Sequence, residues 1–542
     1  MSDPRRCRRQ LLACVCAVTA GLLAAAPGAS AGHDSKVDLA WAPCGEAGAQ
    51  CATAKVPRDY DKPHRGKLRI AVAKSPATGP GERIGSLFFN FGGPGAFAAP
   101  YVEAFGADLF PVLNQRFDIV GMDPRGTGAE GENSMTCDAN QETEGIYSQP
   151  FTTPFNLDRN AFVRKVARHV RQCVSRNADL LPYASTANVA RDLDTLRRAV
   201  GDPKLTYLGF SYGTFLGATY ASMFPGRMRA LALDGPVDAE RYINRPMDWL
   251  KMQSAGFERA FGRFFQACAA DQVACSGFGG SDPWSALDEL VEQANAAPIP
   301  APGYAPDPRP IDGDDLLTAA FSKLYAKQNW GELGKAYAGA ADGDGSLVRQ
   351  IVDEDFHGRD PETGEYDPFN DLYYMLGASE QRYRKGDVDF YLEAGERCWA
   401  EFDHFFANCG YVELYYGLWP IRARDVFRGP FRVPRSAATP LVINTTYDPA
   451  TPYGGGLRLV RDLGNARMLT MRGDGHTAYE RGSPDCIDPA IEAYLIDRVL
   501  PPEGTVCRQT DAPFTAPEEE AAARRQAAPQ LRDRLHTRPI VR

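Results

Sequence analysis

The sequence lacks an excess of positive charge, and after residue 31 it lacks any apolar run long enough to cross a membrane. Lys and Arg total 60 against 69 Asp and Glu, which gives a formal net charge of −9. No nucleic-acid partner is expected, because binding to phosphates needs a basic surface. No membrane anchor is expected either, because a helix needs about 20 apolar residues to span a bilayer.

The first 31 residues have the pattern of a signal peptide. Arginines at positions 5, 6, 8 and 9 precede an apolar run over residues 11–26, and Ala29-Ser30-Ala31 offers small side chains to signal peptidase. We expect cleavage after Ala31 and a secreted, extracellular protein. The general secretory and twin-arginine routes both stay open, since Arg8-Arg9 fits the second. A lipoprotein signal is rejected because almost no apolar region precedes Cys14.

Cysteine spacing typical of a metal site is also missing. Of the 13 cysteines, three lie in the leader and ten remain, none of them in a Cys-x-x-Cys pair or beside histidines at zinc-ligand spacing. No metal and no other cofactor is expected. Export places cysteines where disulfides persist. Sequence does not fix connectivity, but the cysteines fall in neighbouring couples: Cys44 with Cys51, Cys137 with Cys173, Cys268 with Cys275, Cys398 with Cys409, and Cys486 with Cys507.

Short apolar runs alternate with helical patterns along most of the chain. The composition, 44% apolar and 24% charged, can bury a large core. Uninterrupted apolar runs are typical of strands buried on both faces, so the pattern predicts an α/β protein with a largely parallel sheet. Strands are predicted at residues 68–72, 86–90, 117–122, 205–209, 228–233, 441–444 and 466–471, and helices at 186–200, 212–224 and 487–500.

This alternation stops near residue 238 and resumes near residue 439. The intervening residues are rich in aromatic side chains and helical patterns, with a proline-rich stretch at 297–310. We therefore expect five regions: a signal peptide (1–31), the first part of the core (32–238), a helical cap insertion (239–438), the second part of the core (439–508), and a mobile tail (509–542) that has no core-forming face.

Ser211 lies in a Gly-x-Ser-x-Gly pattern between a predicted strand and a predicted helix. Gly209 and Gly213 permit the tight turn that holds a nucleophilic serine at the carboxyl edge of a sheet, and Gly217 lets the helix approach that sheet. The pentapeptide alone is weak evidence, but the flanking strand and helix make it specific. The pattern predicts the nucleophile of an α/β-hydrolase.

A serine nucleophile needs a histidine base oriented by a carboxylate, and on this fold the chain order is Ser, acid, His. Of seven histidines, His476 alone lies after the resumed strands and before the tail, which contains His536. Asp448 follows the preceding strand in a proline-flanked turn. Asp474 is the alternative acid, but it is only two residues from His476. We predict a triad of Ser211, Asp448 and His476.

Acyl transfer also needs amide donors for the developing oxyanion. We expect the backbone N–H of Tyr212 and that of Gly93, in the glycine-rich loop after the strand at residues 86–90. Residues 93–98 also match a Gly-x-Gly-x-x-Ala dinucleotide pattern. That match is interpreted as accidental, because Pro94 lies inside the turn and no clean helix start follows.

Several segments together resemble one family, the secreted bacterial tripeptidyl aminopeptidases, which are α/β-hydrolases related to the proline iminopeptidases. The resemblance spans residues 38–508. It is carried by residues 90–95 (Asn-Phe-Gly-Gly-Pro-Gly), 118–128, 207–214 and 444–452, and by the ending with Gly475-His476-Thr477, Cys486 and residues 501–507. It implies an α/β-hydrolase fold with a mainly parallel sheet and a large, mostly helical cap. It also implies a serine exopeptidase that releases tripeptides, dipeptides or proline-related units from peptides with free N-termini.

The chain departs from the family in two places. Ala96-Phe97-Ala98 stands where the family has a further glycine and a serine, and two family cysteines of the cap are missing, with Cys398 and Cys409 as their replacement. The cap segment in which the family has a cysteine followed by an acid corresponds to Ala378-Ser379-Glu380. The resemblance thus points to Glu380 as the group that binds the substrate amine, against the alternative of one more exposed carboxylate.

An extracellular carboxylesterase or lipase remains the alternative function, since such enzymes share the triad and the oxyanion hole. Acidic residues in the cap, including Asp353-Glu354-Asp355, favour the peptidase because a substrate ammonium needs an anionic partner, although a solvated surface also explains them. A catalytically inactive binding protein is disfavoured, since all three triad residues are present. The oligomeric state is left open, and a monomer is compatible with the sequence.

Overall fold

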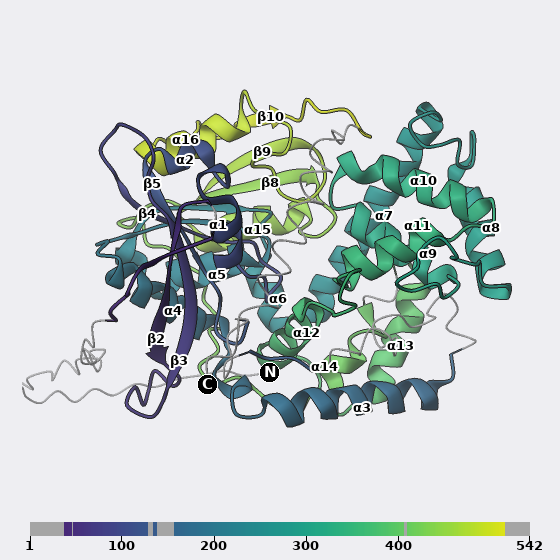
Figure 1. The fold of residues 1–542 in the computed structure, drawn as a ribbon, viewed down its shortest axis with the longest axis horizontal. Coiled ribbons are helices and arrows are strands. Elements are labelled where there is room, and N and C mark those ends of the chain that lie inside the picture. The colour runs from purple at the N-terminus through teal and green to yellow at the C-terminus, as the bar shows by residue number, and fades with distance from the viewer. Residues whose placement is uncertain (1–36, 46, 128–133, 138–156, 406–408, 515–542) are drawn as a thin grey trace, which may run out of the picture. The chain divides into compact units, whose positions relative to one another are not determined.

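The structure is a computed structural model that describes residues 37–45, 47–127, 134–137, 157–405 and 409–514. The predicted signal peptide, residues 1–31, lies outside the described residues, as does the predicted tail from residue 515 onward. Figure 1 shows the fold as a ribbon.

One ten-stranded sheet runs through the core. Its strands, in the spatial order β1-β2-β3-β5-β4-β6-β7-β8-β9-β10, are β1 Ala42–Cys44, β2 Ala49–Pro57, β3 Lys67–Ser75, β5 Phe117–Met122, β4 Gly85–Asn90, β6 Leu205–Phe210, β7 Met228–Asp234, β8 Leu441–Tyr447, β9 Arg467–Asp474 and β10 Val506–Arg508. Strands β5, β4 and β6 to β10 pair in parallel, while β1, β2 and β3 form an antiparallel extension that reaches β5. The predicted parallel sheet is confirmed.

Each predicted strand coincides with an observed one, apart from Ala466, which lies one residue before β9, but three strands were not predicted. Strands β1 and β10 are three residues each, and β2 includes partly exposed polar residues and ends in Pro57. They lack the uninterrupted apolar run that identifies a strand buried on both faces. Their ladder partners, and not their own composition, place them in the sheet.

Helices cover both faces of the sheet, because successive strand residues face opposite sides. Phe88 and Tyr207 belong to one buried apolar cluster, whereas their neighbours Leu87 and Leu208 belong to another. Helices α4 and α5 contribute to the first cluster, and α1 and α16 to the second (Figure 1). The helices outside the cap are α1 Ala99–Phe105, α2 Pro111–Asn114, α3 Arg159–Asn177, α4 Thr186–Ala199, α5 Tyr212–Met223, α15 Tyr453–Leu463 and α16 Ile487–Asp497, with 3-10 turns η1 Gly106–Asp108, η4 Leu181–Tyr183 and η5 Pro225–Arg227.

The described residues between β7 and β8, which we call the cap (239–438), are mostly helical. They form α6 Ala239–Asn244, α7 Pro246–Ala270, α8 Pro283–Ala296, α9 Gly313–Lys323, η6 Lys327–Asn329, α10 Trp330–Ala341, α11 Ser346–Gln350, the π-helical turn η7 Ile351–Phe356, α12 Phe369–Glu380, α13 Val388–Trp399 and α14 Leu414–Leu418. Helices α7 to α11 enclose an apolar cluster of their own, while α12 to α14 contribute to the same cluster as α4 and α5. Part of the cap therefore shares its core with the sheet domain.

The predicted tail starts later than expected. In residues 509–514, the N–H of Thr510 donates to the carbonyl of Gly482, and that of Phe514 donates to the carbonyl of Lys327. Gln509 donates through its amide to the carbonyls of Asp474 and Arg481. These six residues pack against both the core and the cap, so the prediction of a tail from residue 509 is wrong for them.

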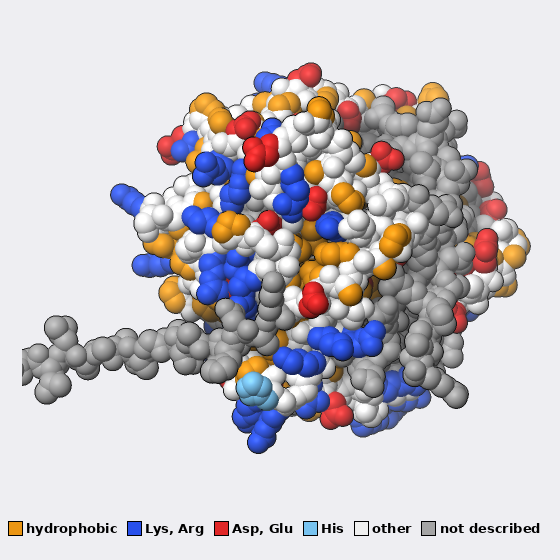
Figure 2. Space-filling model, turned by 60° about the vertical axis from the view of Figure 1, so that its left-hand side comes forward, with side chains coloured by type: hydrophobic (Ala, Val, Ile, Leu, Met, Phe, Trp, Pro, Cys, Tyr) orange, Lys and Arg blue, Asp and Glu red, His pale blue; other side chains and the backbone are white. Residues whose placement is uncertain are grey.

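The surface carries both signs of charge. Figure 2 shows one face, on which Lys and Arg side chains gather in several groups among scattered Asp and Glu. The net negative charge of the chain is therefore not spread evenly. Among the described residues, no helix is both long and apolar enough to cross a bilayer.

All five predicted cysteine couples are disulfides in the structure. They are Cys44–Cys51, Cys137–Cys173, Cys268–Cys275, Cys398–Cys409 and Cys486–Cys507. The last of these joins the start of α16 to β10 and so holds the edge of the sheet. Cys398–Cys409 links the end of α13 to the segment before α14 in the cap.

The disulfide pattern predicts that the mature, oxidised protein has no free thiol. Thiol titration of the protein unfolded in guanidinium without reductant should detect none, and ten after reduction, because all ten cysteines that follow residue 31 are paired. Two or more thiols before reduction would contradict the pairing.

Candidate active site

Ser211 occupies the turn between β6 and α5, at the carboxyl edge of the sheet. Its backbone has φ 54° and ψ −125°, a conformation that costs a residue with a side chain about 1–3 kcal/mol. The turn is held by its own backbone: the N–H of Ser211 donates to the carbonyl of Asp234, and its carbonyl accepts from the N–H of Thr214. The serine is therefore fixed at the edge of the sheet in the orientation expected of a nucleophile elbow.

The glycines around Ser211 are required by close packing. A Cβ at Gly213 would lie 2.5 Å from the carbonyl oxygen of Asn90, and a Cβ at Gly217 would lie 2.5 Å from a methyl of Leu233. A Cβ at Gly209 would lie 2.5 Å from the carbonyl of Gly213. The predicted close approach of helix and sheet is confirmed, since at Gly209 and Gly213 an added Cβ would meet backbone atoms that cannot move aside.

Asp448, which is buried, and His476, whose side chain is 10% exposed, form a pair beside this turn. Asp448 follows β8 and His476 follows β9, and the two neighbouring parallel strands bring them together. The His476 Nδ1 atom lies 2.9 Å from Asp448 Oδ2 and 3.0 Å from Oδ1. The alternative acid, Asp474, is instead paired with Arg263 of α7. Histidine His536 lies outside the described residues.

The Asp448 carboxylate is fully buried and surrounded by donors. Its Oδ1 accepts from the N–H groups of Ala450 (2.9 Å) and Thr451 (2.7 Å), and its Oδ2 accepts from the Thr451 hydroxyl at 2.8 Å. These three hydrogen bonds fix the position of the carboxylate. A fixed anion at Nδ1 keeps the proton of a neutral imidazole there and leaves the lone pair on Nε2.

The other side of His476 is free to accept a proton. Its Nε2 atom is buried and has no hydrogen-bond partner among the described residues. The ring lies against the backbone of Gly235, where a Cβ would come within 2.9 Å of its Cε1 atom. A cap residue, Tyr325, accepts the backbone N–H of His476 at 2.7 Å and contacts the imidazole edge to face at 5.4 Å.

The loop that carries Gly93 contacts the turn that carries Ser211 and Tyr212. Gly92 and Ser211 are in contact, since a Cβ at Gly92 would lie 2.8 Å from that of Ser211 and 3.0 Å from the nitrogen of Tyr212. The N–H of Gly92 is already bonded to Asn90 Oδ1. The next amide, that of Gly93, and the amide of Tyr212 donate to no acceptor in the described part of the chain. The cap closes over this loop, with Phe369 against Gly93.

Glu380, the predicted amine ligand, is buried at the end of α12 and not an exposed carboxylate. It is 2% exposed, and it accepts the N–H of Thr186 at 2.9 Å and the Thr186 hydroxyl at 2.6 Å. Since that hydroxyl proton goes to Glu380, the Tyr212 hydroxyl, 2.5 Å from Thr186 Oγ1, donates to it. Burial raises the pKa of Glu380 to about 7, against the opposing effect of the Thr186 hydrogen bonds.

Sequence reasoning missed a third buried acid at the site, Asp234. It ends β7, is fully buried, and accepts the backbone N–H groups of Ala478 and Tyr479 at 2.8 to 3.0 Å. Burial raises its pKa to about 6, although those amide bonds act in the opposite direction. Only its position, as the polar end of an apolar strand next to the nucleophile strand, could have identified it in the sequence.

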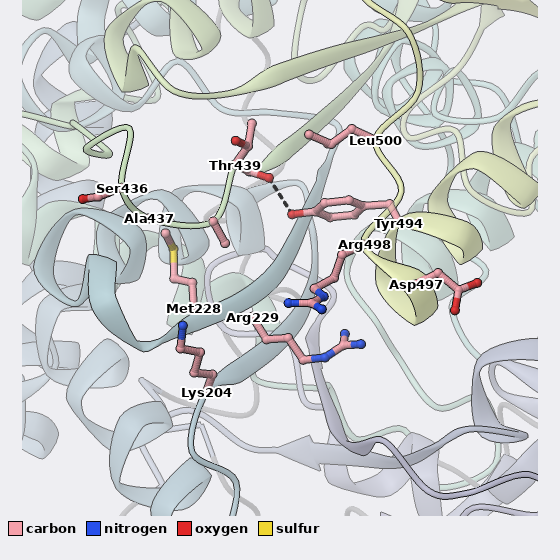
Figure 3. A pocket seen from close by; sticks show the side chains of 11 residues that line it. Lys204, Met228, Arg229, Ser436, Ala437, Thr439, Tyr494, Asp497, Arg498 and Leu500 are labelled. Carbon is pink, nitrogen blue, oxygen red and sulfur yellow. Dashed lines mark hydrogen bonds between the residues drawn. The ribbon is translucent and has the colours of Figure 1, made fainter.

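A separate pocket of about 520 Å³ lies at the amino edge of the sheet (Figure 3). It is lined by Lys204, Met228, Arg229, Ser436, Ala437, Ala438, Thr439, Tyr494, Asp497, Arg498 and Leu500. Arg229 donates to the carbonyls of Leu495 and Ile496, at the end of α16. Ligands of parallel α/β sheets bind beyond the carboxyl ends of the strands, so this pocket is not the reaction site.

Three groups of described side chains have metal-ligand types close together, but two of them consist mainly of disulfide-bonded cysteines. These are Cys137 and Cys173 with His169, and Cys44 and Cys51 with Glu103. A sulfur in a disulfide is not a thiolate ligand. The third group is three carboxylates, the buried Asp59, the exposed Asp61 and the partly exposed Asp425. None of these groups includes a residue of the proposed triad.

Three features together define a serine hydrolase. They are the serine on a strained strand-to-helix turn, the His–Asp pair after the next strands, and the free amides beside the serine. The sequence pattern of the α/β-hydrolase fold matches residues 86–483, and the chain belongs to this family.

Its relatives include named peptidases and an esterase. The chain is 31% identical over 492 residues to the serine protease Hip1 of Mycobacterium tuberculosis (strain ATCC 25618 / H37Rv), an alignment that covers 86% of this chain and 90% of that protein. It is 33% identical over 480 residues to carboxylesterase B of the same strain, covering 85% and 86%. It is 28% identical over 477 residues to the tripeptidyl aminopeptidase of Streptomyces lividans, covering 82% and 81%. The resemblance to the tripeptidyl aminopeptidases is confirmed.

The geometry predicts that Ser211 is the residue acylated in turnover. A fluorophosphonate probe should label the wild type and fail to label Ser211→Ala, because the probe needs a serine activated by the base. Asp448→Ala should be labelled at least 100-fold more slowly, since His476 loses the group that orients it. Equal labelling of wild type and Ser211→Ala would contradict the assignment.

Proposed function

We propose that this protein is an exported serine exopeptidase that releases short peptides from free N-termini through an acyl-enzyme on Ser211. The observation that carries the proposal is Glu380. Among the described residues, no cationic side chain is hydrogen-bonded to this buried carboxylate, which lies one threonine away from the residue that follows the nucleophile. The names of the relatives, a serine protease and a tripeptidyl aminopeptidase among them, support a peptide substrate.

The chemistry of Glu380 fits a substrate ammonium. A buried carboxylate is costly unless it is paired, and both Glu380 bonds come from the neutral Thr186. A carboxylate has about four acceptor positions, so two remain for an ammonium. The substrate cation would supply the missing charge, and a fixed distance between Glu380 and Ser211 would set how many residues are released.

Each proposed residue has one role in the reaction. His476 takes the Ser211 proton as Ser211 Oγ attacks the scissile carbonyl, and Asp448 stabilises the imidazolium that forms. The N–H groups of Gly93 and Tyr212 bind the oxyanion. His476 then gives the proton to the leaving amine, and a water deprotonated by His476 hydrolyses the acyl-enzyme. The products are the short N-terminal peptide and a shortened chain with a new N-terminus.

Export is part of the same proposal. The signal-like first 31 residues support it, and so do the five disulfides, which persist in an oxidising compartment.

An esterase is the second candidate function. The relative named carboxylesterase B supports it, as does the aromatic group beside the nucleophile strand, in which Phe91 stacks on Phe210 and Tyr101 packs on Phe91. This aromatic group can contact an apolar acyl group as well as a peptide side chain.

A hydrolysis panel separates the two candidates. Tripeptide anilides with a free amine, the same peptides N-acetylated, and nitrophenyl esters of increasing chain length are compared by kcat/KM. The proposal predicts a preference of at least about 100-fold for the free amine over the acetylated peptide, because acetylation removes the cation. Equal rates on both peptides, with a strong increase on longer esters, would support the esterase instead.

Glu380→Gln should raise KM for free-amine peptides about 10- to 100-fold, because the ammonium loses a charged partner. Hydrolysis of nitrophenyl acetate should change little, since the substitution leaves the triad intact. The matched variant is Glu413→Gln, at a second buried cap carboxylate whose pKa burial raises to about 8. If Glu413→Gln raises KM and Glu380→Gln does not, the amine site is misplaced.

The proposal also predicts a pH optimum specific to free-amine substrates. Glu380, with a pKa raised to about 7, takes a proton and loses its charge as the pH falls through 7. A substrate ammonium loses its proton above about pH 8. For the wild type, we plot against pH the ratio of kcat/KM on a free-amine peptide to kcat/KM on nitrophenyl acetate. This ratio should have a maximum between pH 7 and pH 8, and the maximum should be much weaker in Glu380→Gln. A ratio independent of pH in the wild type would contradict the role of Glu380.

A further inference from the structure

Asp234 connects the two reacting residues of the site. Its backbone carbonyl accepts the N–H of Ser211 at 2.9 Å. Its carboxylate accepts the N–H of Ala478 at 3.0 and 2.9 Å and that of Tyr479 at 2.8 Å, just after His476. One residue at the end of β7 thus binds the nucleophile turn through its main chain and the histidine loop through its side chain.

The histidine loop depends on these bonds because little regular structure supports it. It leaves β9, and Thr477 has a positive φ of 69°, which a β-branched residue rarely adopts. Four consecutive amides are held from outside the loop: His476 by Tyr325, Thr477 by Asp448, and the next two by Asp234. Asp234 supplies half of these anchors.

Asp234 is not a second triad acid. The Nδ1 atom of His476 is bonded to Asp448, and no hydrogen bond joins His476 to Asp234 among the described residues. Asp234 nevertheless lies close enough to interact with both charges: His476 favours its ionised form and Asp448 opposes it. These two are the charged groups that face it. The carboxylates of Asp448 and Asp234 therefore both lie near the imidazole of His476, but only Asp448 is in contact with it.

We propose that Asp234 is a positioning residue, whose ionised carboxylate holds the 476–479 loop so that His476 Nε2 is aligned with Ser211 Oγ. Its charge also favours the imidazolium formed when His476 takes the serine proton. The role rests on the proposed triad and not on the identity of the substrate. A small misplacement of the base is enough to matter, because an error of about 1 Å can cost 100-fold in rate.

The test is Asp234→Asn, assayed on nitrophenyl acetate. Asparagine keeps the size of the side chain but has one acceptor oxygen where two are used, and its NH₂ group would face an amide N–H. We expect kcat to fall about 100-fold with KM changed less than threefold, and fluorophosphonate labelling of Ser211 to slow by a similar factor.

The matched control is Asp202→Asn. Asp202 accepts the N–H of Ser86 at 2.7 Å, and burial raises its pKa, but it lies before β6, at the opposite edge of the sheet. In both variants, a backbone N–H loses the carboxylate that accepts its hydrogen bond. A purely structural role predicts thermal destabilisation with only small effects on kcat in both variants. The proposal predicts a large loss of kcat in Asp234→Asn alone.

A measurement on the wild type covers the case in which Asp234→Asn does not fold. With histidines labelled with ¹³C, the His476 signal is assigned by its loss in His476→Ala and followed against pH. We expect two inflections, one of them near pH 6, because burial raises the pKa of Asp234 to about 6. Folded Asp234→Asn with kcat within threefold of wild type overturns the proposal, and so does a single inflection. If the enzyme hydrolyses nitrophenyl acetate but no peptide, the aminopeptidase proposal is wrong, while the proposed role of Asp234 is unaffected.

Discussion

The site depends on one strained turn. Ser211 keeps its unfavourable backbone conformation in a turn where α5 approaches the sheet closely, and that approach requires glycine at positions 209 and 213. The turn is fixed between strands β4 and β7, so the free amides and Asp234 are placed by the same strand ladder that places the serine. The strain, about 1–3 kcal/mol, is offset by the burial of α5 in the largest apolar cluster.

The cap takes part in this geometry at three points. Tyr325 holds the backbone of His476, Phe369 covers Gly93, and Glu380 reaches Tyr212 through Thr186. Two of these contacts come from opposite ends of α12. Helix α12 therefore contacts both the loop of Gly93 and, through Thr186, Tyr212, so that in the proposed function a substrate amine at Glu380 would bind to the same helix that borders the two proposed oxyanion donors.

Much of this arrangement could be predicted from the sequence, because it follows from local patterns. The apolar runs predict the parallel strands, and the glycines around Ser211 predict the turn. Chain order places Asp448 and His476 after successive strands. What could not be predicted depends on tertiary contacts. The short strands β1 and β10 are defined by the strands with which they pair. In the sequence, Asp234 cannot be told from a polar residue at the end of any other strand. The burial of Glu380 results from packing between α12 and α4.

The most direct measurement of the central claim is the mass of the enzyme during turnover. A peptide ester with a free amine is mixed with the enzyme and quenched in acid within milliseconds, and the protein is digested and analysed by mass spectrometry. The account predicts that Ser211 carries the N-terminal acyl group of the substrate, and that the same ester with an acetylated amine leaves far less adduct. Product formation without an adduct on Ser211, or an equal adduct from both esters, would contradict it.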